Sequence, residues 1–272
     1  GSKKRMALAL GVDSVEDAAN ALSKLVKAKP PTSLTGACEL LSTALGLRHA
    51  KPKSASSGPC KEVIHKFKDK DYATPEANPS TLLNLPIQQC WPQDAGRFIT
   101  LPCVVTQDPD SKDRNLGMYR MQVFDQRTTA LHWQLQKVAA RHGKRYFEEG
   151  RRMPVSVFLG GDPAYAFCAS APLPDGLDEL LLAGWLRKKS VPLIKCETND
   201  LEVPADADIV LEGYVDPVEP LRDEGPFGDH TGYYTLPEKY PAFHITAITH
   251  RRDAIYPSTI VGPPPMEDFY LG

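Results

Sequence analysis

The sequence has 272 residues, of which 42% are apolar, and its 34 acidic and 32 basic residues leave a formal charge of −2. A chain of this length and composition can bury a core, so wholesale disorder is excluded. The interspersed charges lack the basic footprint of a nucleic-acid-binding protein, and no apolar run is long enough to cross a membrane. The chain begins without Met and ends in a loop-like stretch, so we expect a fragment that is truncated at both ends.

Six cysteines are spread along the chain at long and uneven intervals, without a C-x-x-C pair: Cys38, Cys60, Cys90, Cys103, Cys168 and Cys196. In a chain of this length, such spacing favours buried thiols over a disulfide framework. We therefore expect a cytoplasmic protein.

The first 85 residues are predicted to form a partial N-terminal region. Residues 6–25 have the pattern of a helix, in which Ser14 precedes an apolar-periodic stretch as a capping residue would. Residues 29–59 are rich in Pro, Ser, Lys and Ala and are typical of a linker, with a short helical patch at residues 38–45.

From residue 86 onward, short strands alternate with turns. Strands are predicted at residues 99–106, 117–124, 155–159, 209–215, 243–250 and 255–261, the last two joined by a hairpin turn at 251–254. One helix is predicted to begin at Pro163 with Asp162 as its N-cap, and another to cover residues 175–189. Many strands with few helices predict a β-barrel or α+β domain over residues 86–272, and not a doubly wound sheet.

Asp229 and His230 lie in a glycine-flanked turn that is one candidate for acid–base chemistry. Gly228 and Gly232 allow the backbone to approach a ligand closely, and Glu224 precedes Asp229 by five residues. Two neighbouring carboxyl groups can hold different pKa values and so act as an acid and its partner. Taken alone, the segment favours the plainer interpretation of a polar turn between strands.

Other polar residues are ambiguous on their own. Arg120, near Asn115 in a predicted strand, is either a clamp for a carboxylate or phosphate or a solvated surface residue. Glu179 stands near the start of a helix, where the helix dipole favours an acid whatever its role. His132 and Trp133 have the spacing of half-buried packing residues. Periodicity does not join these residues into one site.

Taken together, these segments resemble the UbiD family of decarboxylases. The motifs occur in the family's order and cover most of residues 86–272: Arg114-Asn-Leu-Gly-Met-Tyr-Arg120, His132-Trp-Gln-Leu-Gln-Lys137, Leu173-Pro-Asp-Gly-Leu-Asp-Glu179, Lys195-Cys-Glu-Thr-Asn-Asp-Leu-Glu-Val-Pro204 and Glu224-Gly-Pro-Phe-Gly-Asp-His-Thr-Gly232. Several independent motifs in one order make the resemblance specific.

The resemblance implies an α+β fold built on a split β-barrel that binds prenylated FMN, with a few flanking helices. It also implies the reversible, non-oxidative decarboxylation of aromatic or α,β-unsaturated acids. Loss of CO2 from an sp² carbon leaves a poorly stabilised carbanion, and the modified flavin takes up that charge. The form of the last motif resembles members that act on hydroxybenzoate-type acids in quinone biosynthesis.

By resemblance, Asn115 and Glu179 would ligate a divalent metal that bridges to the flavin phosphate. Oxygen ligands suit Mn²⁺ or Mg²⁺, and K⁺ is a further candidate ion. Arg120 would orient the substrate carboxylate near Glu224, and Asp229 would donate the proton after CO2 leaves. The residues expected to line the cofactor are Met118, Tyr119, Arg120, His132, Trp133, Gln134, Lys137 and Val138.

The resemblance also implies partners. A flavin prenyltransferase would supply the cofactor, the full-length protein would be a homo-oligomer, and a polyprenyl substrate would bring the protein to the membrane surface. One position departs from the family, which commonly carries His where this chain has Gln136. A Gln oxygen can still ligate or hydrogen-bond, and His132 is an alternative donor.

Two hypotheses of different class remain open. The first is a prenylated-FMN decarboxylase. The second is a catalytically silent flavin-binding or structural module, suggested by Gln136 and by the absence of the family's C-terminal domain from this chain. Flavin reductase activity is a third and weaker alternative, because no nicotinamide-binding fingerprint is present.

Overall fold

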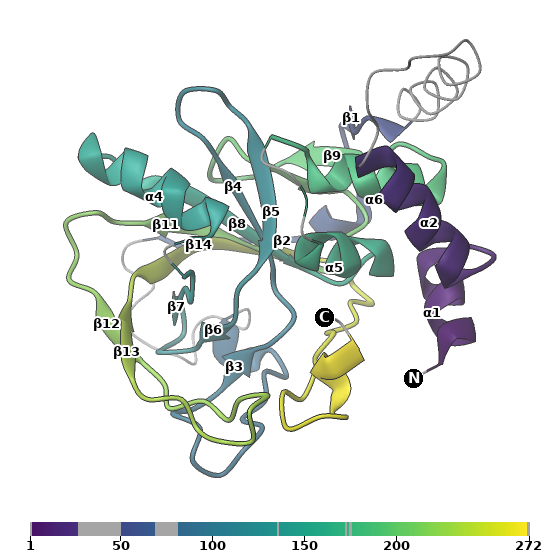
Figure 1. Cartoon of the computed structure of the whole chain (residues 1–272). Coiled ribbons are helices and arrows are strands. Elements are labelled where there is room, and N and C mark those ends of the chain that lie inside the picture. The colour runs from purple at the N-terminus through teal and green to yellow at the C-terminus, as the bar shows by residue number, and fades with distance from the viewer. Residues whose placement is uncertain are drawn as a thin grey trace.

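An antiparallel sheet of seven strands runs through the middle of the computed structural model (Figure 1), which describes residues 2–26, 50–68, 81–134, 136–171, 173 and 176–270. In spatial order the strands are β2 (Val63–Lys66), β14 (Ala242–His250), β11 (Ile209–Val215), β8 (Met153–Leu159), β4 (Cys103–Gln107) and β5 (Arg114–Met118), with β7 (Thr128–Ala130) also paired to β14. Among the described strands, β2 and β5 end the row without pairing with each other, so the sheet does not close into a barrel.

Smaller sheets and the five helices of the described residues surround the central sheet. The small sheets pair β1 (Lys53–Ser54) with β9 (Pro192–Lys195) and β10 (Glu202–Pro204), β3 (Phe98–Ile99) with β6 (Met121–Gln122), and β12 (Arg222–Glu224) with β13 (Glu238–Tyr240). The described helices are α1 (Lys3–Leu10), α2 (Val15–Val26), α4 (Val138–Glu148), α5 (Pro163–Ser170) and α6 (Glu179–Arg187), and the 3-10 turns are η1 (Pro59–Lys61), η4 (Leu82–Asn84) and η5 (Glu267–Tyr270).

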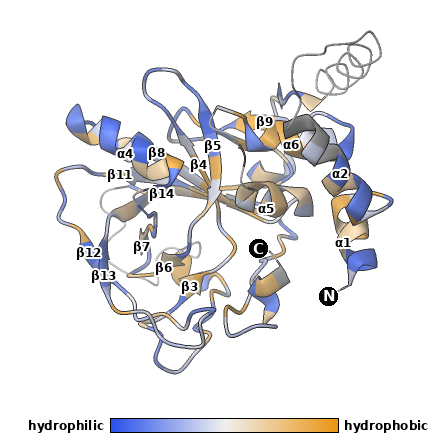
Figure 2. Ribbon diagram, in the orientation of Figure 1, coloured by the Kyte–Doolittle hydropathy of each residue, from blue (hydrophilic) through white to orange (hydrophobic). Residues whose placement is uncertain are grey.

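Both faces of the central sheet are buried, because successive side chains of a strand point to opposite faces. In β4, Cys103 and Val105 pack against α5 and α6, whereas Val104 packs on the other side with the buried residues of α4. Hydrophobic residues accordingly gather in α5 and β9, whereas β12 and β13 are hydrophilic (Figure 2). Burial of one such valine contributes about 1.5–3 kcal/mol.

The predicted helix at residues 6–25 is two helices in the structure. Gly11 ends α1 in the left-handed region, with φ 65°, a conformation that glycine adopts without steric cost. Ser14 then accepts a hydrogen bond from the Asp17 N–H at 3.2 Å and caps α2. The capping signal at Ser14 was thus correct, and the single helix was wrong because Gly11 supplies a stop.

The predicted strand at residues 255–261 is also wrong, and with it the hairpin turn at 251–254. The backbone N–H groups here donate to scattered acceptors and do not form the regular hydrogen bonds of a β-sheet. The N–H groups of Arg251 and Ile255 donate to the carbonyl and side chain of Asp208, at 2.9 and 3.1 Å. The Thr259 N–H donates to Thr100 Oγ1 at 3.0 Å.

Other predicted elements are confirmed with changed boundaries. The strands at 209–215 and 243–250 are β11 and β14, and the helix capped by Asp162 is α5. The strand expected at 99–106 is split into β3 and β4 around Pro102, which lacks a backbone donor. Helix α4 was not predicted, and the helical patch at 38–45 lies outside the described residues.

The region before residue 86 contributes strands to two sheets. β1 pairs with β9 in parallel, and β2 pairs with β14. The boundary at residue 85 stays a prediction. No helix in the part of the chain that the structure describes is long and apolar enough to cross a membrane. The five described cysteines are free thiols, four of them buried and Cys90 half-buried.

Candidate active site

A buried carboxylate, Glu224, lies at the centre of the first candidate site. Its side chain is 0% exposed at the end of β12. The Arg120 guanidinium donates from Nε to Oε1 at 2.8 Å and from Nη2 to Oε2 at 3.0 Å. His132 Nδ1 lies 3.2 Å from the same Oε2. The structure thus brings together three residues that the sequence pattern could not join, in a two-point contact that fixes both position and orientation.

Short backbone segments hold these side chains in place. Arg120 lies in the turn between β5 and β6, and His132 follows β7. The His132 N–H donates to the Arg120 carbonyl at 3.2 Å, which ties the two segments together. The Arg120 guanidinium also stacks 4.5 Å from the ring centre of Phe227, which packs against Phe98. Arg120 is therefore restrained on two sides.

Opposing effects set the pKa of Glu224. Burial alone would raise it, but the hydrogen bonds from His132 and Arg120 and the positive charge of Arg120 outweigh burial and hold the pKa below its ordinary value of 4.5. Glu224 is therefore ionised in this structure, and its carboxylate does not hold a proton at rest.

This pKa shift predicts an acid-sensitive contribution to stability. A carboxyl group with a lowered pKa binds fewer protons when folded, so its contribution is complete above pH 4.5 and is lost as the pH falls through the folded pKa. We expect Glu224→Gln to flatten this part of the pH dependence in urea denaturation. Glu148→Gln, whose side chain is 65% exposed, is the control. Equal acid sensitivity of wild type and Glu224→Gln would contradict the prediction.

Asp94 anchors the loop that follows Glu224, and the sequence analysis did not single it out. Its Oδ1 accepts from the Gly228 N–H at 2.7 Å and its Oδ2 from the Trp91 N–H at 2.8 Å. A Cβ at Gly228 would lie 2.3 Å from Trp91 Cδ1, so only glycine fits there. The spacing of Trp91 and Asp94, three residues apart, is the local signal that could have indicated this turn.

Asp229, the predicted proton donor, stands in the same loop. Its side chain is 22% exposed, and its Oδ1 accepts from the backbone N–H of His230 at 2.6 Å and contacts His230 Nδ1 at 2.5 Å. Among the described residues, no hydrogen bond joins Asp229 to Glu224 or Arg120. The role of Asp229 stays a prediction.

A second, polar cavity of about 250 Å³ lies at the edge strand β5. Its lining includes Asn115 of β5, Val138 and Arg141 of the first turn of α4, and Glu179 at the start of α6. Two helix N-termini and three arginines, Arg114, Arg141 and Arg145, thus meet at one cavity, beside the carboxylates of Asp108, Asp113 and Glu179. Unpaired N–H groups at a helix N-terminus favour an anion.

Asn115 and Glu179, the predicted metal ligands, are brought together in this cavity. Glu179 Oε2 accepts from the Leu116 N–H at 2.9 Å, which places the carboxylate beside the strand that carries Asn115. Burial raises the pKa of Glu179 to about 7, against the lowering effect of the Leu116 N–H. The Asn115 amide nitrogen donates to the Tyr119 hydroxyl at 3.5 Å, so its oxygen has no hydrogen bond among the described residues.

The donor set of this cavity fits a phosphate with a divalent cation. Asn115 and Glu179 offer oxygen ligands, which suit Mn²⁺ or Mg²⁺. Helix α4 has no side-chain cap at Lys137, although its Ala139 N–H donates to the Tyr119 hydroxyl, so its N-terminus can offer the remaining first-turn N–H groups to a phosphate. The described residues contain no group of three or more His, Cys, Asp or Glu side chains that could hold a metal. A metal bound in this cavity therefore needs further ligands besides Glu179, from the Asn115 side chain or from the bound phosphate.

The remaining predicted cofactor residues fall into two groups. Tyr119 and Trp133 are buried in the core on the α4 side of the sheet, and Met118 is half-buried. Gln134 and Lys137 are exposed. Gln136, which replaces the family's His, is also exposed, and its side chain donates to Gln134 Oε1 at 2.7 Å. None of these contacts tests their predicted roles.

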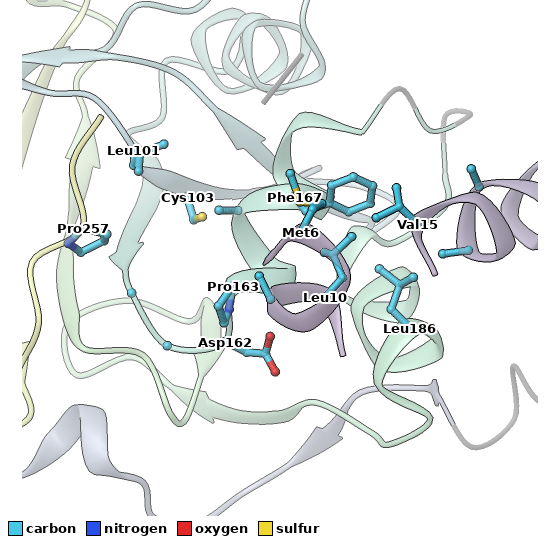
Figure 3. Close-up of a pocket in the computed structure, with 16 residues that line it drawn as sticks. Met6, Leu10, Val15, Leu101, Cys103, Asp162, Pro163, Phe167, Leu186 and Pro257 are labelled. Carbon is cyan, nitrogen blue, oxygen red and sulfur yellow. The ribbon is translucent and has the colours of Figure 1, made fainter. Parts of the chain in front are cut away.

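A larger cavity of about 590 Å³ lies apart from both polar clusters. Figure 3 shows it between Met6, Leu10 and Val15 at the N-terminal helices and Phe167 of α5. Its lining is almost wholly apolar. The one carboxylate among the described residues that line it, that of Asp162, accepts hydrogen bonds from Arg187 and from the Ala164 N–H. Ligand sites need convergent polar groups as well as apolar walls, so the chemistry is assigned to the two polar clusters.

The family model described as the 3-octaprenyl-4-hydroxybenzoate carboxy-lyase Rift-related domain, UbiD, matches residues 52–264. The chain therefore belongs to the UbiD family. It is 47% identical to an uncharacterized protein of Archaeoglobus fulgidus and 44% identical to one of Aquifex aeolicus. Each match covers 100% of this chain but 53% and 54% of the relatives, so the chain spans about half the length of the curated relatives it matches.

Solved structures of the UbiD class share the fold over the whole chain. The enzyme HmfF from Pelotomaculum thermopropionicum, in complex with prFMN, matches with a TM-score of 0.80 at 29% identity, covering 100% of this chain and 56% of that one. The vanillic acid decarboxylase of Sedimentibacter hydroxybenzoicus matches with a TM-score of 0.80 at 27% identity, covering 100% and 53%. The mixed α+β fold expected from the sequence is thus confirmed.

Proposed function

We propose that this chain carries the prenylated-FMN-binding part of a carboxy-lyase that removes CO2 from an aromatic or α,β-unsaturated acid without oxidation. The observation that carries the proposal is the pair of polar clusters: a buried Arg120–Glu224 pair and an anion-favouring cavity that holds Asn115 and Glu179. Membership in the UbiD family and the prFMN complex of HmfF support the cofactor. The split-barrel form and the ions Mn²⁺, Mg²⁺ and K⁺ are parts of this proposal.

Each cluster has a separate task in this proposal. Asn115 and Glu179 hold a divalent cation, and Arg141 with the first turn of α4 holds the flavin phosphate. When bound, the modified flavin supplies the electron sink that decarboxylation at an sp² carbon requires. Arg120, restrained by Glu224 and Phe227, orients the substrate carboxylate, and Asp229 delivers the proton that replaces CO2.

The proposal is tested by loading the chain with its cofactor. Co-expression with a flavin prenyltransferase is expected to give a chain with a flavin absorption band and the mass of the modified flavin. Glu179→Gln should weaken Mn²⁺-dependent retention of the flavin at least about 10–100-fold, because the ionised ligand is lost. Glu148→Gln, on the exposed face of α4, is the matched control.

Two outcomes of this experiment would contradict the proposal. If no flavin co-purifies under any metal condition, the chain is not a cofactor-binding part. If flavin is retained but no CO2 release and no deuterium exchange into an arene or alkene product is measured, the silent flavin-binding module is the better description. Gln136, exposed and bonded to Gln134 instead of lining the cavity, is the observation that favours that second candidate.

A further inference from the structure

A chain of hydrogen-bonding groups runs from the surface to the buried Glu224. Glu238 is exposed on β13, and the Tyr240 hydroxyl lies 2.7 Å from its Oε2. The same hydroxyl lies 3.4 Å from His132 Nε2, and His132 Nδ1 lies 3.2 Å from Glu224 Oε2. Each member can both give and take a proton, so the contacts form an unbroken path.

The strand register explains why this path exists. β12 and β13 pair so that Glu224 lies directly opposite Glu238, and Arg222 opposite Tyr240. Like charges directly opposite on neighbouring strands repel each other. The His132 ring, stacked on Tyr240 with ring centres 4.2 Å apart, contacts Glu224 through one nitrogen and Tyr240 through the other. An imidazole in this position joins the two carboxylates through groups that carry protons.

Other charged groups near the path are already engaged. Arg120 lies on the inner side of Glu224 and takes both of its oxygens. Arg222, across from Tyr240, pairs with Glu219, and Lys239 pairs with Asp223 at 3.0 Å. Burial and the hydrogen bond to Glu238 raise the pKa of Tyr240, so its hydroxyl keeps a proton and can only pass one on as it receives another.

We propose that Glu238, Tyr240 and His132 form a proton relay that delivers protons from solvent to Glu224. A proton enters on the Glu238 carboxylate and passes to the Tyr240 oxygen, while the Tyr240 proton passes to His132 Nε2 and the His132 Nδ1 proton passes to Glu224. Three bonds to hydrogen break and three form, and one proton is transferred from Glu238 to Glu224. The half-buried ring resets by exchanging protons with water.

The use of the relay rests on the proposed function. Each decarboxylation replaces CO2 by a proton, which Asp229 gives to the carbon in the proposed function. The relay supplies protons to the buried carboxylate that positions Arg120. The relay assigns His132, expected from the resemblance to line the cofactor, to the carboxylate instead. It makes Glu238 and Tyr240 positioning and transfer residues that act through His132.

The relay is tested first on the chain itself, labelled with ¹⁵N-histidine. Glu238 does not touch His132, yet Glu238→Gln is expected to change the ¹⁵N shifts of both His132 ring nitrogens. Asp223→Asn removes the same charge from the same hairpin outside the path and is expected to leave them unchanged. In a Tyr240→Phe background the effect of Glu238→Gln should vanish. An effect no larger than that of Asp223→Asn, or one that persists without the hydroxyl, overturns the relay.

A second measurement uses the flavin-loaded protein. Glu238→Gln and Tyr240→Phe are expected to slow deuterium uptake into the product at least about tenfold with little change in KM, whereas Asp223→Asn leaves it unchanged. Uptake equal to wild type in both path variants overturns the relay. If the wild type takes up no deuterium, the proposed function fails, and the histidine measurement still decides the relay.

Discussion

Arg120→Ala is expected to destabilise the protein by about 3–5 kcal/mol, because it leaves the Glu224 carboxylate buried and without its bidentate partner. The loss exceeds what a surface ion pair contributes, since Glu224 is 0% exposed and loses both hydrogen bonds from the guanidinium. The measurement is the free energy of unfolding from urea denaturation at neutral pH.

Arg151→Ala is the matched control for Arg120→Ala. Arg151 also pairs with a glutamate, Glu149, but the two side chains are 56% and 40% exposed. Its removal is expected to cost less than about 1 kcal/mol. In an Arg120→Ala/Glu224→Gln double variant, part of the loss should return, because no buried charge is left unpaired. Equal losses for Arg120→Ala and Arg151→Ala would contradict this account of the buried pair.

Asp229→Asn is expected to lower deuterium exchange into a product-like arene or alkene by about 10²–10⁴-fold in the flavin-loaded protein. The amide keeps the size of the side chain but cannot deliver a proton at the reacting carbon. Because Asp229 lies outside the cavity of Asn115 and Glu179, flavin retention should stay at the wild-type level. The measurement is isotope uptake by mass spectrometry beside the flavin absorbance.

Asp253→Asn is the control for this variant, since Asp253 is 79% exposed in a turn and pairs with Arg251. It should exchange deuterium at the wild-type rate. Full exchange by Asp229→Asn would remove Asp229 as the donor, and the hydrogen bonds that Asp229 makes with His230 would then be structural.

The strands of the sheet centre could be predicted because their pattern is local. β11 matches residues 209–215 since both of its faces are buried and its residues are apolar except at Glu212 and Gly213. The strand predicted at 255–261 is absent from the structure because its apolar residues are not all buried; Ile255, for example, is 73% exposed. Alternation in the sequence says nothing about whether a partner strand is available.

From periodicity the candidate site could be predicted only as separate residues, and only the family resemblance grouped them. Arg120, His132 and Glu224 come from three segments, and their meeting depends on the pairing of β12 with β13 and on the contact between the His132 N–H and the Arg120 carbonyl. Such long-range contacts leave no trace in periodicity. Asp94 was missed for the same reason, since its partner Gly228 lies 134 positions away.

The hydrogen bond from the Leu116 N–H to Glu179 has a consequence for self-association. β5 is the last strand of its sheet, and an uncovered edge strand is a template on which another chain can pair. Glu179 accepts the hydrogen bond of one backbone N–H on that edge, and its buried carboxyl group covers the strand there. A substitution such as Glu179→Ala therefore uncovers a strand edge as well as removing an oxygen ligand, and aggregation of that variant would have its origin there.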